Sequence, residues 1–205
     1  EYWDRGRVAA MRHTTMDGSA DLADAPNVRA YQLAGTKHGA GSFPASNGGG
    51  QFPENTNDYR WAQKGLLGAL DAWARLGTEP PPSTHPNLTD GTLVAHKDFR
   101  FPALPGVQQP TFVPGGYRAD VPAPYSALPF LVPKVDADGN DAAGIRLPIV
   151  SVPLATLTGW NFRSPQIGAP STLIAMAGSY IALPKTKADR ERTKDPRLSI
   201  AERYG

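Results

Sequence analysis

Apolar and polar side chains alternate over residues 27–34, a spacing that is typical of a half-buried strand. The alternation stops at Gly35, and residues 35–41 contain three glycines and His38. Glycine permits the sharp change of direction that a chain needs when it leaves a sheet. We therefore expect a strand that ends in a glycine-rich loop, with His38 at the carboxyl end of the strand.

The clearest helical pattern extends over residues 57–76. Leu66, Leu70 and Trp73 recur at helical spacing, which predicts one apolar face. Asn57 is suited to cap the amino end, and Gly77 is suited to end the helix. We expect the apolar face to pack on the sheet.

The stretch from residue 88 to residue 133 consists of short apolar runs separated by Pro and Gly, which favours edge strands and a loop wrapped over a body. Two further apolar runs, residues 131–135 and 144–147, flank the turn-forming residues 136–140 and predict a β-hairpin. Residues 136–141 partly resemble a calcium-binding loop. They lack its Asp/Asn register and its closing Glu, so a hairpin turn is the expected structure.

Three further helices are predicted, each from a weaker pattern. The first covers residues 3–12 and the second covers residues 171–182. The third lies near residues 200–204, within a highly charged tail over residues 185–205.

Composition narrows the possible classes of protein. The chain has 205 residues, enough for one large domain or two small ones, and contains 21 Gly and 21 Pro. So many residues that break helices exclude a helical bundle or a coiled coil. Basic and acidic residues nearly balance at 21 and 19, which argues against a dedicated binder of nucleic acid or of a membrane surface.

Cysteine is absent from the sequence, so disulfides, iron–sulfur clusters, zinc–thiolate sites and cysteine nucleophiles are excluded within these 205 residues. His13, His85 and His96 show no metal-ligand spacing. We expect no metal and no cofactor. No apolar run approaches the roughly 18 residues that a membrane span needs.

The sequence begins with Glu1, Tyr2 and Trp3 rather than with methionine or a signal peptide. We expect it to be the carboxyl-terminal part of a longer protein.

The candidate chemistry centres on His38. A serine enzyme of the α/β-hydrolase type carries its nucleophile in a Gly-x-Ser-x-Gly turn, and no serine in the sequence has glycine at both positions. In that fold the order along the chain is serine, acid, histidine, and the histidine follows a strand. His38 fits that position, although a histidine in an ordinary surface loop would fit the same pattern.

Several dispersed motifs carry a resemblance to a known family. They are EYW, DGSAD, NVRAYQLAGTKHG, NDYRWAQKGLLGALDAWARLGTEPPPS, DGTLV, LVPKVDADGNDAAGIRLP, VPLATLTGWNFR, GSYIALPKT and DPRLSIAERY, in this order. Together they resemble the carboxyl-terminal half of the bacterial alpha/beta hydrolase domain proteins, over nearly all of the chain. The resemblance implies an esterase-type hydrolase and places the catalytic histidine at His38. It also implies that the half carrying the nucleophile and most of the parallel sheet is missing.

The acid partner of His38 is expected at Glu1, where this fold places its carboxylate after the preceding strand. A carboxylate there would accept a hydrogen bond from the imidazole and fix its tautomer. Asp17 and Asp21 are the alternatives; both lie close to the start of the His38 strand, and Asp17 lies in a predicted turn.

The sequence thus predicts an α/β protein: the last strand and following helix of an α/β-hydrolase fold, with a Pro/Gly-rich loop and hairpin elaboration. Residues 1–77 would form the last part of the α/β-hydrolase core, with the loop that carries His38. Residues 78–205 would form a Pro/Gly-rich extension packed on this core. The predicted function is hydrolysis of a small-molecule carboxylic ester, with the serine on an upstream segment. The alternative is a non-catalytic binding or structural module. The resemblance favours export (periplasmic or secreted) over a cytoplasmic location.

Overall fold

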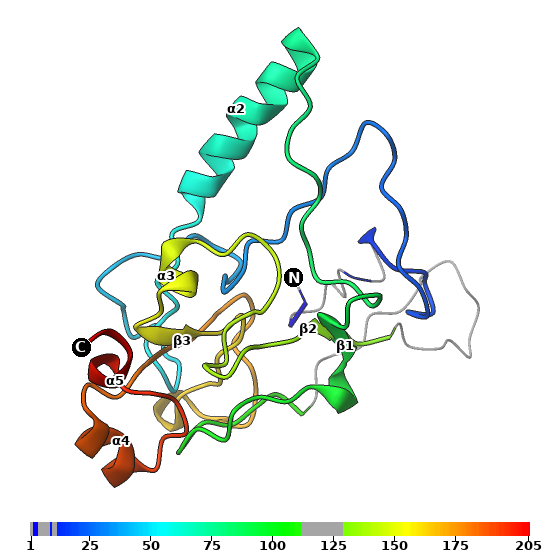
Figure 1. Ribbon diagram of the computed structural model, residues 1–205. Coiled ribbons are helices and arrows are strands. Elements are labelled where there is room, and N and C mark those ends of the chain that lie inside the picture. The colour runs from blue at the N-terminus through cyan, green and yellow to red at the C-terminus, as the bar shows by residue number, and fades with distance from the viewer. Residues whose placement is uncertain (1, 4–8, 10–11, 112–128) are drawn as a thin grey trace.

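The structure is a computed structural model that describes residues 2–3, 9, 12–111 and 129–205. Short elements and long ordered loops form a body, and one helix projects from it (Figure 1). The helix predicted over residues 3–12 falls mostly outside the described residues.

The projecting helix is α2, Arg60–Leu76. It ends at Gly77, whose φ of 69° is the left-handed conformation that favours glycine after a helix. Asn57 does not cap it. The residue before the helix is Tyr59, and the Asn57 side chain is buried instead. The predicted helix and its end at Gly77 are confirmed, its start lies three residues later than expected, and its predicted cap is wrong.

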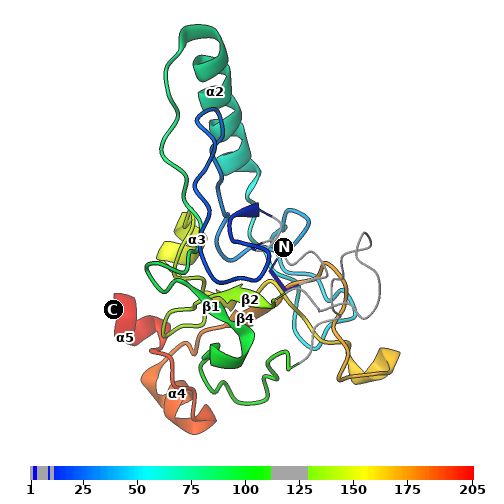
Figure 2. The same cartoon turned by 90° about the vertical axis from the view of Figure 1, so that its right-hand side faces the viewer.

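The predicted packing of α2 on a sheet is also wrong. None of its residues is buried, and two views at right angles show it standing clear of the sheets (Figure 2). Leu66 and Trp73 are half-buried against the chain around residues 28–31 and Pro80. The Arg29 guanidinium lies 4.8 Å from the centre of the Trp73 ring. The sheets of the described residues have two strands each, so they offer no broad face for the helix to cover.

The strand predicted over residues 27–34 is an extended segment with two isolated bridges. Tyr31 pairs with Thr84, and Leu33 pairs with Ile145, both in parallel. The partner segment before Thr84 contains Pro80–Pro82, which have no backbone N–H groups to donate. The pairing therefore cannot extend into a regular ladder on that side.

The two sheets are antiparallel pairs. β1, Leu93–Ala95, pairs with β2, Leu131–Pro133, and β3, Ala155–Leu157, pairs with β4, Tyr180–Ala182. The edge strands expected between residues 88 and 133 are confirmed by the first pair.

The hairpin predicted between residues 131–135 and 144–147 is wrong, because the partner of β2 is β1, and Ile145 pairs with Leu33. A tight turn does form between the two segments. Val135 bridges Asp141, and the Asp136 amide donates to the Asn140 carbonyl at 2.8 Å.

The remaining described elements are short. They are η1, His96–Asp98; α3, Pro148–Ser151; η2, Pro165–Ile167; α4, Lys187–Thr193; and α5, Ile200–Tyr204. The helix predicted over 171–182 is wrong, since β4 begins at Tyr180. The helical tail is confirmed, and both α4 and α5 begin with a complete capping box.

The core combines an aromatic cluster with buried amides. Tyr2 and Trp3 pack with Leu93, Phe99 and Trp160, which come from distant parts of the sequence. Four buried asparagines hydrogen-bond the loops together: Asn55, Asn57, Asn140 and Asn161. Because the described strands are so short, these side-chain amides satisfy backbone groups that a larger sheet would satisfy by itself.

Candidate active site

His38 is the one exposed residue of the loop over residues 35–41, and it lines a cavity of about 110 Å³. The loop leaves the extended segment at Gly35, whose φ is +63°, and a Cβ there would come within 2.9 Å of Val150 Cγ2. Glycine is therefore required on two grounds at the point where the chain turns toward His38. The structure places His38 in a concave, accessible position after an extended segment.

Side chains of the residues that lead into α2 hydrogen-bond the backbone of this loop. Asn55 Nδ2 donates to the Gly35 carbonyl at 3.0 Å, and Asn57 Nδ2 donates to the Ala34 carbonyl at 3.0 Å. The Tyr59 hydroxyl donates to the His38 carbonyl at 2.5 Å. Three side chains spaced two residues apart thus hold three carbonyls of the loop that carries His38. The backbone around His38 is ordered by side chains and not by a strand ladder.

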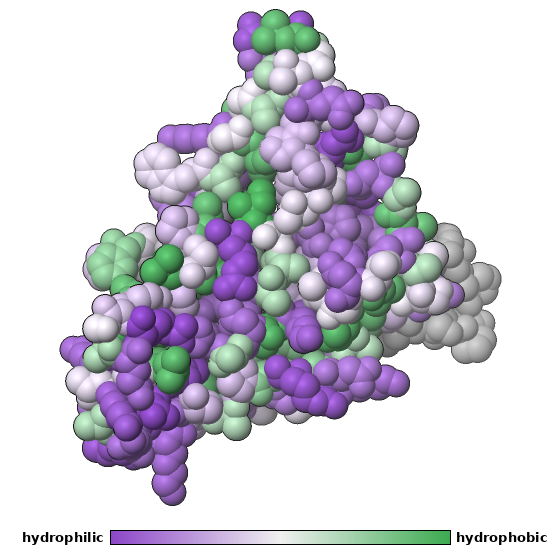
Figure 3. Space-filling view, viewed as in Figure 1, coloured by the Kyte–Doolittle hydropathy of each residue, from purple (hydrophilic) through white to green (hydrophobic). Residues whose placement is uncertain are grey.

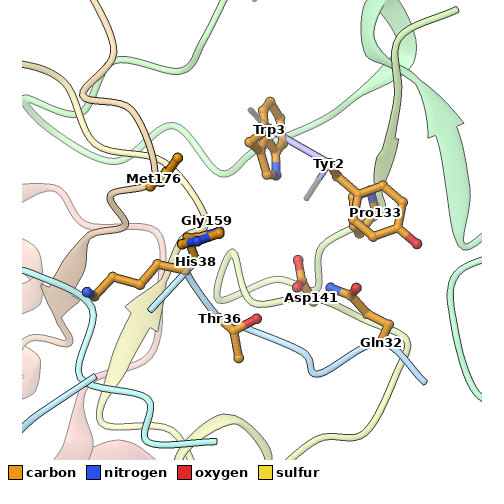
Figure 4. Close-up of a pocket in the computed structure, with 10 residues that line it drawn as sticks. Tyr2, Trp3, Gln32, Thr36, His38, Pro133, Asp141, Gly159 and Met176 are labelled. Atoms are coloured by element: carbon orange, nitrogen blue, oxygen red, sulfur yellow. The ribbon is translucent and has the colours of Figure 1, made fainter. Parts of the chain in front are cut away.

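Aromatic side chains form one wall of the cavity. Tyr2 and Trp3 both line it (Figure 4), and each also contacts side chains that do not line the cavity. The Trp3 ring packs edge-on against Phe99 and Trp160, with centroids 4.8 Å and 6.2 Å away. The Tyr2 hydroxyl is 2.9 Å from His13 Nε2. The wall is therefore rigid and mostly apolar.

The opposite wall is polar and comes from Gln32, Thr36 and Asp141 (Figure 4). Asp141 Oδ2 accepts a hydrogen bond from the Gly35 N–H at 2.9 Å. Burial raises the pKa of Asp141 to about 6, although the hydrogen bonds from Gly35 and Gln32 favour its ionised form. A cavity lined by both an exposed imidazole and a half-buried carboxyl is a favourable place for proton-transfer chemistry.

Comparison with known protein families matches residues 9–205 to one described as "Alpha/beta hydrolase domain". The chain belongs to the alpha/beta hydrolase domain family. No match was found among the curated proteins or among the solved structures. The family resemblance expected from the motifs is thereby confirmed, and it supports a hydrolase-like function for this chain.

Of the carboxylates considered as partners of His38, Glu1 lies outside the described residues of this hydrolase-family chain. The structure places Asp17 and Asp21 away from the cavity. Asp17 accepts hydrogen bonds from Thr15 and Ser19, which hold its pKa at about 2. Asp21 accepts from the backbone amides of Leu88 and Thr89, at 2.8 Å each. Asp17 therefore orders its own turn, and Asp21 orders the turn that begins at Leu88.

The structure also accounts for the other patterns that the sequence analysis weighed. In residues 136–141, Asp136 Oδ1 accepts from the amides of Asp138 and Asn140, and its Oδ2 accepts from Arg146 at 2.8 Å. This carboxylate therefore closes its own turn. Nowhere in the described parts of this family member do three His, Asp or Glu side chains gather as metal ligands. Within the same residues, no helix has the length and apolarity needed to cross a membrane.

Sequence reasoning did not identify Asp141, Asn55, Asn57 or Tyr59 as parts of this site in the hydrolase-family chain. The sequence predicts a helix cap at Asn57, since Asn is typical of helix starts, and it gives no role to Asn55. Asp141 looked like one acidic residue among several in a turn. Their roles depend on contacts with residues 34–38, which lie 20 to 106 residues away along the chain, and no local pattern records such contacts.

Proposed function

We propose that this chain is the histidine-bearing part of a serine hydrolase that cleaves a small-molecule carboxylic ester. His38 would act as the general base that activates the serine and then as the acid that protonates the leaving group. The observation that carries this proposal is the exposed His38 side chain at a cavity, on a glycine-bordered loop, in a chain of the alpha/beta hydrolase domain family.

Glu1 is the carboxylate that we propose as the partner of His38. The two residues that follow it in the sequence, Tyr2 and Trp3, line the same cavity as His38. Asp17 and Asp21 are engaged elsewhere, which supports Glu1 over these alternatives. A carboxylate at the imidazole would select the productive tautomer and stabilise the imidazolium that forms during catalysis.

The nucleophile must come from a segment that this sequence does not contain, since none of its serines has the Gly-x-Ser-x-Gly context. We propose that this segment precedes Glu1 in the same hydrolase.

The exposed apolar side chains of α2 support a contact between this helix and a further segment of the protein. Trp61 is 69% exposed, Leu67 is 66% exposed and Leu76 is 77% exposed, and Figure 3 shows apolar surface along α2 and at its tip. An apolar helix surface of this kind is typical of a contact with another part of a protein.

The reaction would proceed through an acyl-enzyme, formed when the serine oxygen attacks the ester carbonyl and the alcohol leaves with a proton from His38. Water would then release the carboxylic acid by the reverse use of the same histidine. The oxyanion hole would also lie on the nucleophile-bearing segment. The cavity holds roughly three water molecules' worth of space, which suits a short acyl or alcohol group next to His38.

A fluorophosphonate probe tests this proposal. Such a probe labels an activated serine covalently. The full-length protein should be labelled on a serine in a Gly-x-Ser-x-Gly sequence outside these 205 residues, as read by peptide mass spectrometry. The 205-residue chain by itself should show neither labelling nor ester turnover, since it would lack both nucleophile and oxyanion donors. Labelling of a serine within the chain would contradict the proposal, and a full-length protein without any labelling would favour the non-catalytic module.

A further inference from the structure

We propose that Asp141 is a positioning residue for His38, holding the histidine loop from across the cavity through the backbone of Gly35. The inference rests on the proposed function of His38. It adds a second carboxylate to the site, on a part of the chain about a hundred residues from the histidine loop, and this carboxylate acts on the loop backbone rather than on the substrate.

The contact is the hydrogen bond from the Gly35 N–H to Asp141 Oδ2, at 2.9 Å. Gly35 is the residue at which the chain turns toward His38, in the left-handed conformation. The side chains of Asn55, Asn57 and Tyr59 all donate to carbonyls of this loop. Asp141 instead accepts from an amide, so it fixes the direction of the peptide plane that begins the turn.

The turn that carries Asp141 is held by hydrogen bonds of its own, independent of the bond to Gly35. Val135 bridges Asp141 at its base, and Arg146 Nη1 donates to the Asp141 carbonyl at 2.9 Å. Ile145 exchanges backbone hydrogen bonds with Gln32 and Ala34, at 2.7 Å and 3.0 Å. The histidine loop and the turn are therefore joined by two backbone hydrogen bonds and by the Asp141 carboxylate.

The Asp141 carboxyl has a shifted pKa and lines a cavity, which together are typical of groups in functional sites. Burial raises its pKa to about 6, and the charge of Asp136 acts in the same direction, while Arg146 opposes them. Tyr2, Lys37 and His38 are the titratable groups that share the cavity with it. An ionised carboxylate is a stronger acceptor for the Gly35 N–H than a neutral carboxyl or amide, so the charge strengthens the hold on the loop.

Kinetics of the full-length hydrolase test the proposal, with p-nitrophenyl acetate as the probe. Asp141→Ala should lower kcat on the order of 100-fold with little change in KM, because a small displacement of the catalytic base is costly. Asp141→Asn keeps the shape and an acceptor oxygen, and should lower kcat on the order of 10-fold. In the wild type, kcat/KM should fall at low pH with the uptake of two protons, one of them on Asp141. In Asp141→Asn it should fall with the uptake of one proton.

The melting temperature separates positioning from a structural role. Asp141→Asn removes a charge whose ionisation is disfavoured in the folded protein, and should melt at or above the wild-type temperature at pH 8 while turning over more slowly. The matched control is Asp138→Asn, in the same turn, whose carboxylate pairs with Arg203 and not with the loop. This control should leave kcat and the pH profile as in the wild type.

The proposal is overturned if Asp141→Asn has wild-type kcat and pH profile, or if Asp138→Asn slows turnover equally. Hydrogen exchange provides a readout that does not depend on activity. The peptide spanning residues 33–40 should exchange at least about tenfold faster in Asp141→Ala, and unchanged exchange would contradict the proposal. A wild-type protein without esterase activity, or an active His38→Gln variant, would instead contradict the proposed function and leave the exchange result to decide on Asp141.

Discussion

At the residue scale, His13 is a buried histidine whose protonation opposes folding. It is 2% exposed, its Nε2 is 2.9 Å from the Tyr2 hydroxyl, and its ring lies 4.3 Å from that of His85. Burial and the neighbouring His85 lower its pKa to about 4. His13 is therefore neutral in the folded protein at neutral pH and supports the aromatic wall of the cavity through Tyr2.

The pH dependence of stability follows from this lowered pKa. An unfolded histidine titrates near 6.5, so below that pH the unfolded state binds a proton that folded His13 does not accept. Folding stability should be full above about pH 6.5 and should fall as the pH is lowered toward 4, by at most about 3 kcal/mol from this residue. His13→Gln should show a flatter decrease of melting temperature over this range. Parallel decreases in the two proteins would count against a neutral, buried His13.

At the element scale, α2 is a helix whose apolar surface exceeds what the described residues cover. Whether another segment of the protein covers this surface can be tested by the effect of a substitution on the free energy of unfolding. Leu67 is 66% exposed, and truncating an exposed side chain normally changes stability by less than about 0.5 kcal/mol. If the nucleophile-bearing segment covers Leu67, then Leu67→Ala should destabilise the full-length protein by about 2–3 kcal/mol.

Helix propensity cannot produce this loss, because alanine is a better helix former than leucine. Gln63→Ala is the matched control, one turn away on the same helix at an exposed position, and should be nearly neutral in denaturant unfolding. Equal and small effects of both substitutions would mean that α2 stays uncovered in the full-length protein.

The elements that the sequence predicted are those whose signals are local. The apolar spacing and Gly77 indicated α2, and the Thr186 and Ser199 capping boxes accompany the predicted helical tail. The failures concern pairing. Residues 131–133 were expected to pair with the segment just after the turn, but they pair with β1, about 38 residues earlier. Alternation identifies an extended chain and does not identify its partner.

At the scale of the whole molecule, the site is assembled from segments that are far apart in the sequence. The amino-terminal aromatics, the His38 loop, the 136–141 turn and Gly159 meet around one cavity (Figure 4). The position of His38 after an extended segment could be predicted from the sequence, because its glycine-bordered loop is a local feature. Asp141 and the supporting asparagines could not, since each has its role only through a contact across the fold.

Substitution of His38 in the full-length protein tests most directly whether this loop carries the catalytic base. His38→Gln keeps a polar side chain on the loop but cannot take a proton from a serine. It should lower kcat for p-nitrophenyl acetate by at least about 1,000-fold, with an unchanged melting temperature because His38 is exposed. His85→Gln, a histidine outside the cavity, should retain turnover. A His38→Gln enzyme that turns over like the wild type would contradict the assignment of His38 as the catalytic base.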